Sequence, residues 1–249
     1  MSAAEADARR NDTSAQPAPS HDGQTHAILA LDTALRSVVV ALATTDGTPI
    51  AETTWEAGYR HGETLLPSIQ RVLGESNIRR SRLRGIVVGT GPGAFTGLRV
   101  GLATAKGLAR ALGQPIVGVS TGEALLEAAA HETGAPIEML VLLLPAGPSD
   151  RVVVRSSGRP ALLPGGAEPD LGSGERLVAV DLDGRAPDDA LTIGRSAVRG
   201  LARVLLSRGG ERLARDDSDD LARLVPEYVT LPRGVRQASG EVAWSHDRP

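Results

Sequence analysis

The feature that most constrains the fold is a glycine-rich segment, residues 89–101, between a predicted strand and a predicted helix. Residues 85–89 have the apolar centre of a buried strand, and residues 96–112 have the spacing of a helix that Gly113 ends. Glycine in such a turn permits a positive φ or a close approach of two backbones. The sequence therefore predicts a structural glycine turn formed by Gly91, Pro92, Gly93 and Gly97.

The glycine turn is compatible with more than one kind of chemistry. The start of the following helix could bind an anion, or the turn could join strand and helix without any ligand. The pattern Gly89-x-Gly91-x-x-Ala94 formally fits a dinucleotide fingerprint, but it follows the fourth predicted strand and no acidic residue follows about twenty positions later. A P-loop is excluded because no Gly-Lys-Ser/Thr follows the glycines.

The order of the predicted elements indicates an α/β protein. In the first half, strands are expected at residues 27–31, 38–42, 50–55, 85–89 and 115–119, and helices from 61–64 onward, at 96–112 and at 123–132. Proline is tolerated in the first turn of a helix, so Pro67 sets the start of the first one. In the second half, we expect strands at 138–144, 152–155 and 178–182, a loop at 157–175 and a helix at 189–208. A strand meander followed by alternating helices and strands predicts a mixed sheet covered by helices.

Composition excludes several classes of function. The chain has no cysteine among its 249 residues, so disulfide frameworks, cysteine-ligated metal sites and a cysteine nucleophile are excluded. Its few aromatic residues and net charge of −3 argue against base-stacking platforms and against the whole chain binding polyanions. The first 25 residues have no apolar run that could form a signal peptide, and no later run is long enough to span a membrane. We expect a cytoplasmic protein that does not contact membranes.

The helix at 96–112 has two apolar faces. The core face consists of Leu98, Gly101, Leu102, Ala105, Leu108, Ala109 and Leu112, and a narrow basic stripe of Arg99, Lys106 and Arg110 lies beside it. The second apolar face, called here the small-residue face, consists of Val100, Ala103, Thr104, Gly107 and Ala111. A surface helix normally exposes a wide charged face to water, so we interpret the small-residue face as a partner-binding surface. The alternative is that it packs against another helix or domain of this chain.

Few residues are candidates for chemistry. Asp32 ends the first predicted strand and could hold a metal or phosphate, although an aspartate that makes a turn is commoner. His61 could be a base or a ligand, but no second histidine is near it in sequence. The segment 216–220 lacks the glycine and terminal glutamate of a calcium loop and is expected to be a solvated acidic loop. No catalytic triad or histidine metal motif is present in the sequence.

Four segments of the chain carry a family resemblance. They are Ile28-Leu-Ala-Leu-Asp-Thr33, His61-Gly-Glu-Thr-Leu-Leu-Pro67, the glycine–helix block at 91–109, and Val117-Gly-Val-Ser120 with Glu123-Ala-Leu125. Together they closely resemble the bacterial TsaB (YeaZ-like) family over about residues 27–126, with a weaker match at 226–232. Residues 145–190 depart from that family: Pro145-Ala-Gly-Pro-Ser-Asp150 and Arg151-Val-Val-Val154 stand where it has Asp-Ala-Arg followed by Glu-Val-Tyr.

The resemblance implies an actin-like ATPase fold, as in sugar kinases and heat-shock chaperones, with two subdomains that each hold a mixed β-sheet covered by helices. Residues 1–25 have no apolar periodicity and are expected to be a disordered tail, and residues 233–249 a C-terminal tail. Applied to the rest of the chain, the resemblance implies an N-terminal subdomain at 26–119 and a second, degenerate subdomain at 120–232.

The family also implies a function. TsaB is the partner of the catalytic subunit TsaD, and a further ATPase, TsaE, joins them. Together they make threonylcarbamoyl-adenosine beside the anticodon of tRNAs that read codons beginning with A. The resemblance thus implies a non-catalytic scaffold that forms a heterodimer with TsaD and activates it, that meets tRNA through the complex, and that could form a homodimer when alone. ATP or ADP and a metal are then expected on TsaD and TsaE, with no intrinsic cofactor here.

Departures from TsaD support the non-catalytic interpretation. The chain has no His-x-x-x-His pair, which TsaD uses to bind a metal, and residues 32–37 lack the glycine of a phosphate-gripping hairpin. Asp32 and Thr33 would then be a vestigial nucleotide site. The alternative is an active ATPase or small-molecule kinase of the same fold that uses Asp32. A peptidase of the glycoprotease-like (M22) type, an older family label, has no zinc site in this sequence.

Overall fold

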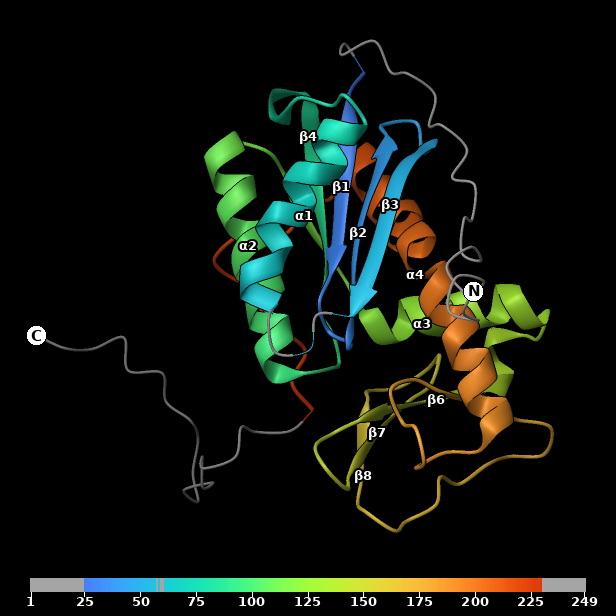
Figure 1. Cartoon of the computed structure of the whole chain (residues 1–249). Coiled ribbons are helices and arrows are strands. Elements are labelled where there is room, and N and C mark those ends of the chain that lie inside the picture. Colours follow the sequence, from blue (N-terminus) through green and yellow to red (C-terminus); the bar gives the residue numbers. More distant parts are fainter. Residues whose placement is uncertain (1–24, 57, 59–60, 230–249) are drawn as a thin grey trace, which may run out of the picture.

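The structure, a computed structural model, describes residues 25–56, 58 and 61–229, with His61 described by its backbone alone. The expected tails at 1–25 and 233–249 lie outside the described residues, apart from Thr25. Two β-sheets form the framework, and helices pack against both of them (Figure 1).

The first sheet has five strands in the order β3-β2-β1-β4-β5. Its strands are β1 (Ala27–Asp32), β2 (Ser37–Thr44), β3 (Pro49–Glu56), β4 (Leu83–Gly89) and β5 (Ile116–Val119). The first three form the predicted antiparallel meander, and β4 and β5 run parallel to β1. Parallel pairing brings the carboxyl ends of β1, β4 and β5 to one edge of the sheet, where the glycine turn lies.

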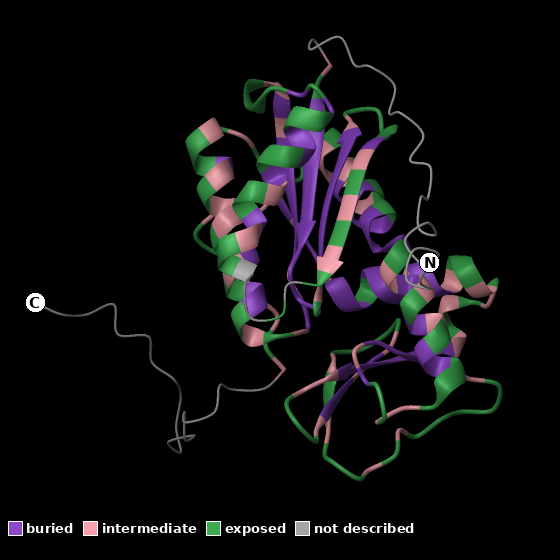
Figure 2. Ribbon diagram, viewed as in Figure 1, coloured by how far each residue is buried: buried purple, intermediate pink, exposed green. Residues whose placement is uncertain are grey.

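Helices cover both faces of this sheet. Helices α1 (His61–Glu75) and α2 (Phe95–Leu112) pack on one face, and α4 (Asp188–Ala214) packs on the other beside α3 (Thr121–Thr133). Strand β1 is buried at every position because alternate side chains enter different cores (Figure 2). Leu29 packs with Leu65 on the α1–α2 side, and Ile28 packs with the α3–α4 side.

The start of α1 corrects one expectation. The helix begins at His61, so Pro67 lies beyond the first turn, where we expected it to fall. Proline lacks the N–H that would bond to the carbonyl of Glu63 four residues earlier. Because Pro67 is exposed, its ring meets solvent and the helix continues past it.

The second sheet has the strand order β8-β7-β6-β9. Its strands are β6 (Leu140–Pro145), β7 (Arg151–Val154), β8 (Ala161–Leu163) and β9 (Arg176–Ala179), and β6 and β9 are parallel. Strand β8 lies within residues 157–175, which we expected to be a loop, and that expectation is wrong there. β8 is a short edge strand with little burial, so it has no hydrophobic alternation that a sequence pattern could detect.

Helix α4 is longer than expected and joins the two sheets. We predicted its end at Arg208, but it continues through Gly209 and Gly210 to Ala214. A Cβ on Gly209 would lie 2.3 Å from Cγ2 of Val87, so glycine lets the helix lie close against the first sheet. Packing against the sheet thus stabilises a helical turn that two glycines would otherwise weaken. The two remaining short elements are 3-10 helices at Arg80–Arg82 and Ile137–Met139.

Candidate functional site

Asp32 lies at the carboxyl end of β1 and is fully buried. Its Oδ1 accepts a 2.7 Å hydrogen bond from the Ala34 N–H, and its Oδ2 accepts a 2.6 Å bond from the Thr121 hydroxyl. Burial raises the pKa of this carboxyl to about 6, although both hydrogen bonds act to lower it. The carboxylate therefore connects the end of β1 with the start of α3.

Thr33 is buried beside Asp32 and holds the start of α2. Its hydroxyl donates a 2.7 Å hydrogen bond to the carbonyl of Gly97. A Cβ at Gly101 would lie 2.1 Å from the same hydroxyl oxygen, so only glycine fits there. The two residues of the expected vestigial nucleotide site are thus occupied by bonds within the chain.

The glycine turn lies directly over Asp32 and Thr33. Gly91 has φ +105°, and its N–H donates a 3.0 Å hydrogen bond to the Thr121 hydroxyl. Gly93 meets the first hairpin: a Cβ there would lie 2.3 Å from the carbonyl oxygen of Ala34. That carbonyl accepts a 2.7 Å bond from the Ala94 N–H. The sequence predicted that glycine in this turn permits either a positive φ or a close backbone approach. Gly91 has the positive φ, and Gly93 makes the close approach.

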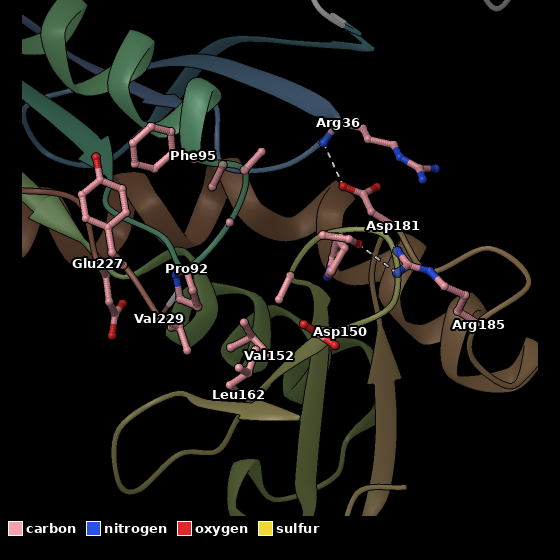
Figure 3. Close-up of a pocket in the computed structure, with 17 residues that line it drawn as sticks. Arg36, Pro92, Phe95, Asp150, Val152, Leu162, Asp181, Arg185, Glu227 and Val229 are labelled. Carbon is pink, nitrogen blue, oxygen red and sulfur yellow. Dashed lines mark hydrogen bonds between the residues drawn. The ribbon is translucent and has the colours of Figure 1, made fainter. Parts of the chain in front are cut away.

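A cleft of about 730 Å³ opens between the two sheets (Figure 3). It lies at the carboxyl ends of β1, β4, β6 and β9, and its charged lining residues are Arg36, Asp150, Asp181, Arg185 and Glu227. Neither Asp32 nor Thr33 lines it.

Both arginines of the cleft are already engaged within the chain. The Arg36 side chain pairs with Asp183 at 3.0 Å, and Arg185 donates to the carbonyls of Gly147 and Pro148 at 3.1 and 3.0 Å. Of the two, Arg36 is ion-paired, whereas Arg185 is held by neutral carbonyls and keeps an uncompensated charge among the described residues.

The segment after α4 corrects the expectation of a solvated acidic loop. Asp219 accepts a 2.7 Å hydrogen bond from the Gly118 N–H and pairs with Arg212 at 3.1 Å. Asp217 pairs with the same guanidinium at 2.7 Å. The carboxylates at 217 and 219 therefore fasten this segment to α4 and β5. Asp220 accepts hydrogen bonds from the Ala222 and Arg223 N–H groups at 2.7 and 3.0 Å, and Asp216 is exposed.

Further along, the chain crosses α2 and the glycine turn. Lys106 donates from Nζ to the carbonyl of Leu224 at 2.9 Å, and Arg99 donates from Nε to the Tyr228 hydroxyl at 3.0 Å. The Arg99 guanidinium also lies over the Phe95 ring, 3.9 Å from its centroid. Two residues of the predicted basic stripe thus bind the chain's own C-terminal segment, which no sequence pattern indicated.

The small-residue face of α2 lies open over most of its length. Ala103, Gly107 and Ala111 are exposed, and a Cβ at Gly107 would meet no atom within 4 Å. Val100 and Thr104 are half-buried, and Val100 packs against the core. The alternative of packing within the chain therefore applies to Val100 but not to the three exposed positions.

One exposed apolar residue of the neighbouring helix α1 was not predicted. Leu66 of α1 is 47% exposed. Thr64 and Arg71 of the same helix hydrogen-bond to Trp55 and Thr53, which puts β3 on that side of α1. Helical spacing puts Leu66 on the opposite side, toward α2. The sequence signal was present, because Leu66 lies outside the core spacing of α1.

The described residues contain no group of three or more His, Asp or Glu side chains that could hold a metal ion. Arg82 and Arg84 lie 3.3 and 2.8 Å from Nε2 of His26. The pKa of His26 is lowered by desolvation and, to a smaller extent, by the positive charges of Arg84 and Arg82. His131 lies 4.0 Å from Glu127 on the same helix.

None of the helices in the described part of the chain is long and apolar enough to cross a membrane.

Comparison with known proteins gives consistent matches. Residues 55–169 match the family model "TsaD: tRNA N6-adenosine threonylcarbamoyltransferase". The chain is 38% identical over 109 residues to the tRNA threonylcarbamoyladenosine biosynthesis protein TsaB of Escherichia coli, covering 43% of this chain and 46% of that protein. It is 36% identical over 107 residues to TsaB of Bacillus subtilis, with the same coverage. The match thus spans about half the length of these curated relatives.

A solved structure matches over a greater length. YeaZ from Pseudomonas aeruginosa superposes with a TM-score of 0.64 at 26% identity, covering 82% of this chain and 99% of that one. The two helix-covered mixed sheets and the cleft between them define an α/β protein of the actin-like ATPase and sugar-kinase class. Within that class, the matches support assignment of the chain to the TsaB (YeaZ-like) family.

Proposed function

We propose that this chain is the non-catalytic partner of a TsaD-type transferase in the N6-threonylcarbamoylation of tRNA. The substrate is the adenosine next to the anticodon in tRNAs that read codons beginning with A. In this proposal the chain forms a heterodimer with the transferase and activates it. A TsaE-type ATPase joins the complex, and tRNA meets the chain through it.

The observation that carries this proposal is the small-residue face of α2. Ala103, Gly107 and Ala111 expose an uncharged surface along about two helical turns, and Leu66 of the neighbouring helix α1 is exposed. Small side chains let another helix approach closely, which favours packing over charge as the source of binding energy. Because TsaD resembles TsaB in fold, the two could pair pseudo-symmetrically, and the free chain could pair with itself through the same face.

The surroundings of Asp32 support the absence of intrinsic catalysis. Asp32 is fully buried, lies outside the cleft lining and is held by Thr121 and Ala34. A carboxylate that positions a metal or a phosphate must reach its ligand, so these contacts weigh against the ATPase or kinase alternative. ATP or ADP and metal would then bind TsaD and TsaE.

Co-expression of this chain with the TsaD-type transferase of the same organism, followed by size-exclusion chromatography, tests the partnership. We expect the two to elute together and the isolated chain to neither hydrolyse ATP nor transfer threonylcarbamoyl groups. Separate elution would contradict the partnership. ATP turnover by the isolated chain that Asp32→Ala abolishes would instead establish the enzyme alternative.

A further inference from the structure

The five arginines of α4 divide into two groups. Arg208 pairs with Glu123 and Glu127 at 2.7 and 2.6 Å, and Arg212 pairs with Asp217 and Asp219. The other three have no ion-pair partner among the described residues: Arg195 and Arg199 donate only to the hydroxyls of Thr192 and Ser196, at 2.9 and 2.7 Å, and Arg203 has no polar partner. We name Arg195, Arg199 and Arg203 the arginine stripe.

The arginine stripe lies on one exposed side of the helix. Its members are four residues apart, so the helical rise places neighbours about 6 Å apart along the axis. From Thr192 to Ser207, the exposed side chains of α4 are the three stripe arginines and the hydroxyl residues at the two ends, Thr192 and Ser207. This stretch of the surface therefore offers hydrogen-bond donors and positive charge, with neither carboxylates nor exposed apolar groups on the helix itself.

Acidic residues lie near both ends of the stripe: exposed Glu211 lies about two turns beyond Arg203 on the same helix, and three carboxylates line a groove beside Arg195 and Arg199. That groove, of about 330 Å³, is lined by Arg195 and Arg199 of the stripe, by Arg36, and by the carboxylates of Glu56, Asp181 and Asp183. Arg36 engages two of these carboxylates, through its backbone N–H to Asp181 and its side chain to Asp183. Arg203, about one turn beyond Arg199, lies outside the groove lining.

We propose that the arginine stripe is a binding surface for the phosphodiester backbone of RNA. Arginine forms paired hydrogen bonds to phosphate and stays charged, and a row of regularly spaced cations fits a strand of regularly spaced phosphates. The lack of exposed apolar side chains beside the stripe is unlike a membrane anchor or the buried centre of a protein interface. The inference rests on the proposed function, which supplies tRNA as the RNA.

The test compares two triple variants of the full-length chain with equal changes of charge. The stripe variant is Arg195→Gln, Arg199→Gln and Arg203→Gln. The control variant is Arg79→Gln, Arg80→Gln and Arg159→Gln, three exposed arginines outside α4. Glutamine keeps the helix propensity of arginine, so circular dichroism melting should match the wild type.

Binding of a labelled, unmodified tRNA transcript is measured by fluorescence anisotropy over a range of salt concentrations, for the chain alone and for its complex with the transferase. We expect the stripe variant to bind at least about tenfold more weakly at low salt, with the slope of log affinity against log salt reduced by about 2 to 3. The control variant should bind within about twofold of wild type.

Three results would overturn the proposal: wild-type affinity of the stripe variant, an equal loss in the control variant, or binding of polyglutamate as tight as that of RNA. Size-exclusion chromatography with the transferase separates this proposal from the proposed function. The stripe variant should co-elute with the transferase as the wild type does. If the wild type fails to co-elute, the proposed function is wrong, whereas the comparison of the two variants on the isolated chain still decides the RNA surface.

Discussion

Thr121 donates a 2.6 Å hydrogen bond to Asp32 across 89 residues of sequence. The same hydroxyl accepts a bond from the Gly91 N–H, so one side chain joins the end of β1, the glycine turn and the start of α3. A Cβ on Gly89 would lie 1.7 Å from Oδ2 of Asp32, which shows how closely the end of β4 packs on the carboxylate. Asp32 therefore holds together the edge of the first sheet from which the helices leave.

The raised pKa of Asp32 predicts a specific dependence of stability on pH. The pKa is about 6 in the folded chain, so between pH 4 and 6 the folded protein keeps a proton that the unfolded chain has lost. The contribution of this group to stability is full at pH 4, falls as the pH rises to 6, and changes by about 3 kcal/mol in total. Urea unfolding from pH 4 to 7.5 measures the free energy of unfolding of the wild type and of Asp32→Asn. As the pH rises, the wild type should lose stability relative to the variant. A difference independent of pH would contradict the burial of this carboxyl.

The two glycines of the turn should tolerate substitution poorly. In Gly91→Val the new residue must adopt φ +105°, and in Gly93→Val the new Cβ meets the Ala34 carbonyl at 2.3 Å. Each should lose about 1–3 kcal/mol of stability, seen as a lower melting temperature before any loss of partner binding. Gly74→Val is the control, because a Cβ there has no atom within 4 Å. Unchanged melting of both turn variants would show that the turn accepts side chains.

A bulky charge on the small-residue face should block partner binding and leave the fold intact. Ala103 and Gly107 are exposed, so Ala103→Glu and Gly107→Arg should melt close to the wild type. In the complex each would bury an unpaired charge, and binding should weaken by at least about 2 kcal/mol, roughly 30-fold. Ala161→Glu, an exposed position on β8, is the matched control and should bind normally. Pull-down with the transferase and melting of each free variant are the measurements.

The outcomes of that experiment exclude each other. Melting far below the wild type in both face variants would mean that the face packs inside the chain. Normal folding with normal binding would place the interface elsewhere.

Two carboxylates of the acidic segment, Asp219 and Asp216, should contribute very differently to stability. Asp219→Asn weakens the pair with Arg212 and the bond from the Gly118 N–H, so it should lower stability by about 1–3 kcal/mol. Asp216 is exposed with φ +54°, a conformation that asparagine also adopts, so Asp216→Asn should be nearly neutral. Thermal melting of the two variants compares their stabilities directly. Equal effects would mean that the segment is a solvated acidic loop after all.

The sequence by itself determined the first sheet and its helices. The apolar run of β1, the glycine stop at Gly113 and the spacing of α2 are local signals, and each element formed at the predicted place within a few residues. The core face of α2 was also readable: Leu98, Gly101, Leu102, Ala105 and Ala109 are buried, and Leu108 and Leu112 are half-buried. Such patterns work because backbone periodicity and burial act over one helix or strand.

Tertiary structure alone decided which polar residues are free. Asp32 and Asp219 are both aspartates at the end of an element or in a loop, yet each is held by a partner about 90 or 100 residues away, Thr121 and Gly118. The same is true of the arginines of α4, where contacts with α3 and the C-terminal segment neutralise Arg208 and Arg212, whereas Arg195 has no ion-pair partner among the described residues. Hydrogen bonds and ion pairs depend on distances of a few ångströms between segments that only folding brings together, so the charge pattern of the chain could not show them.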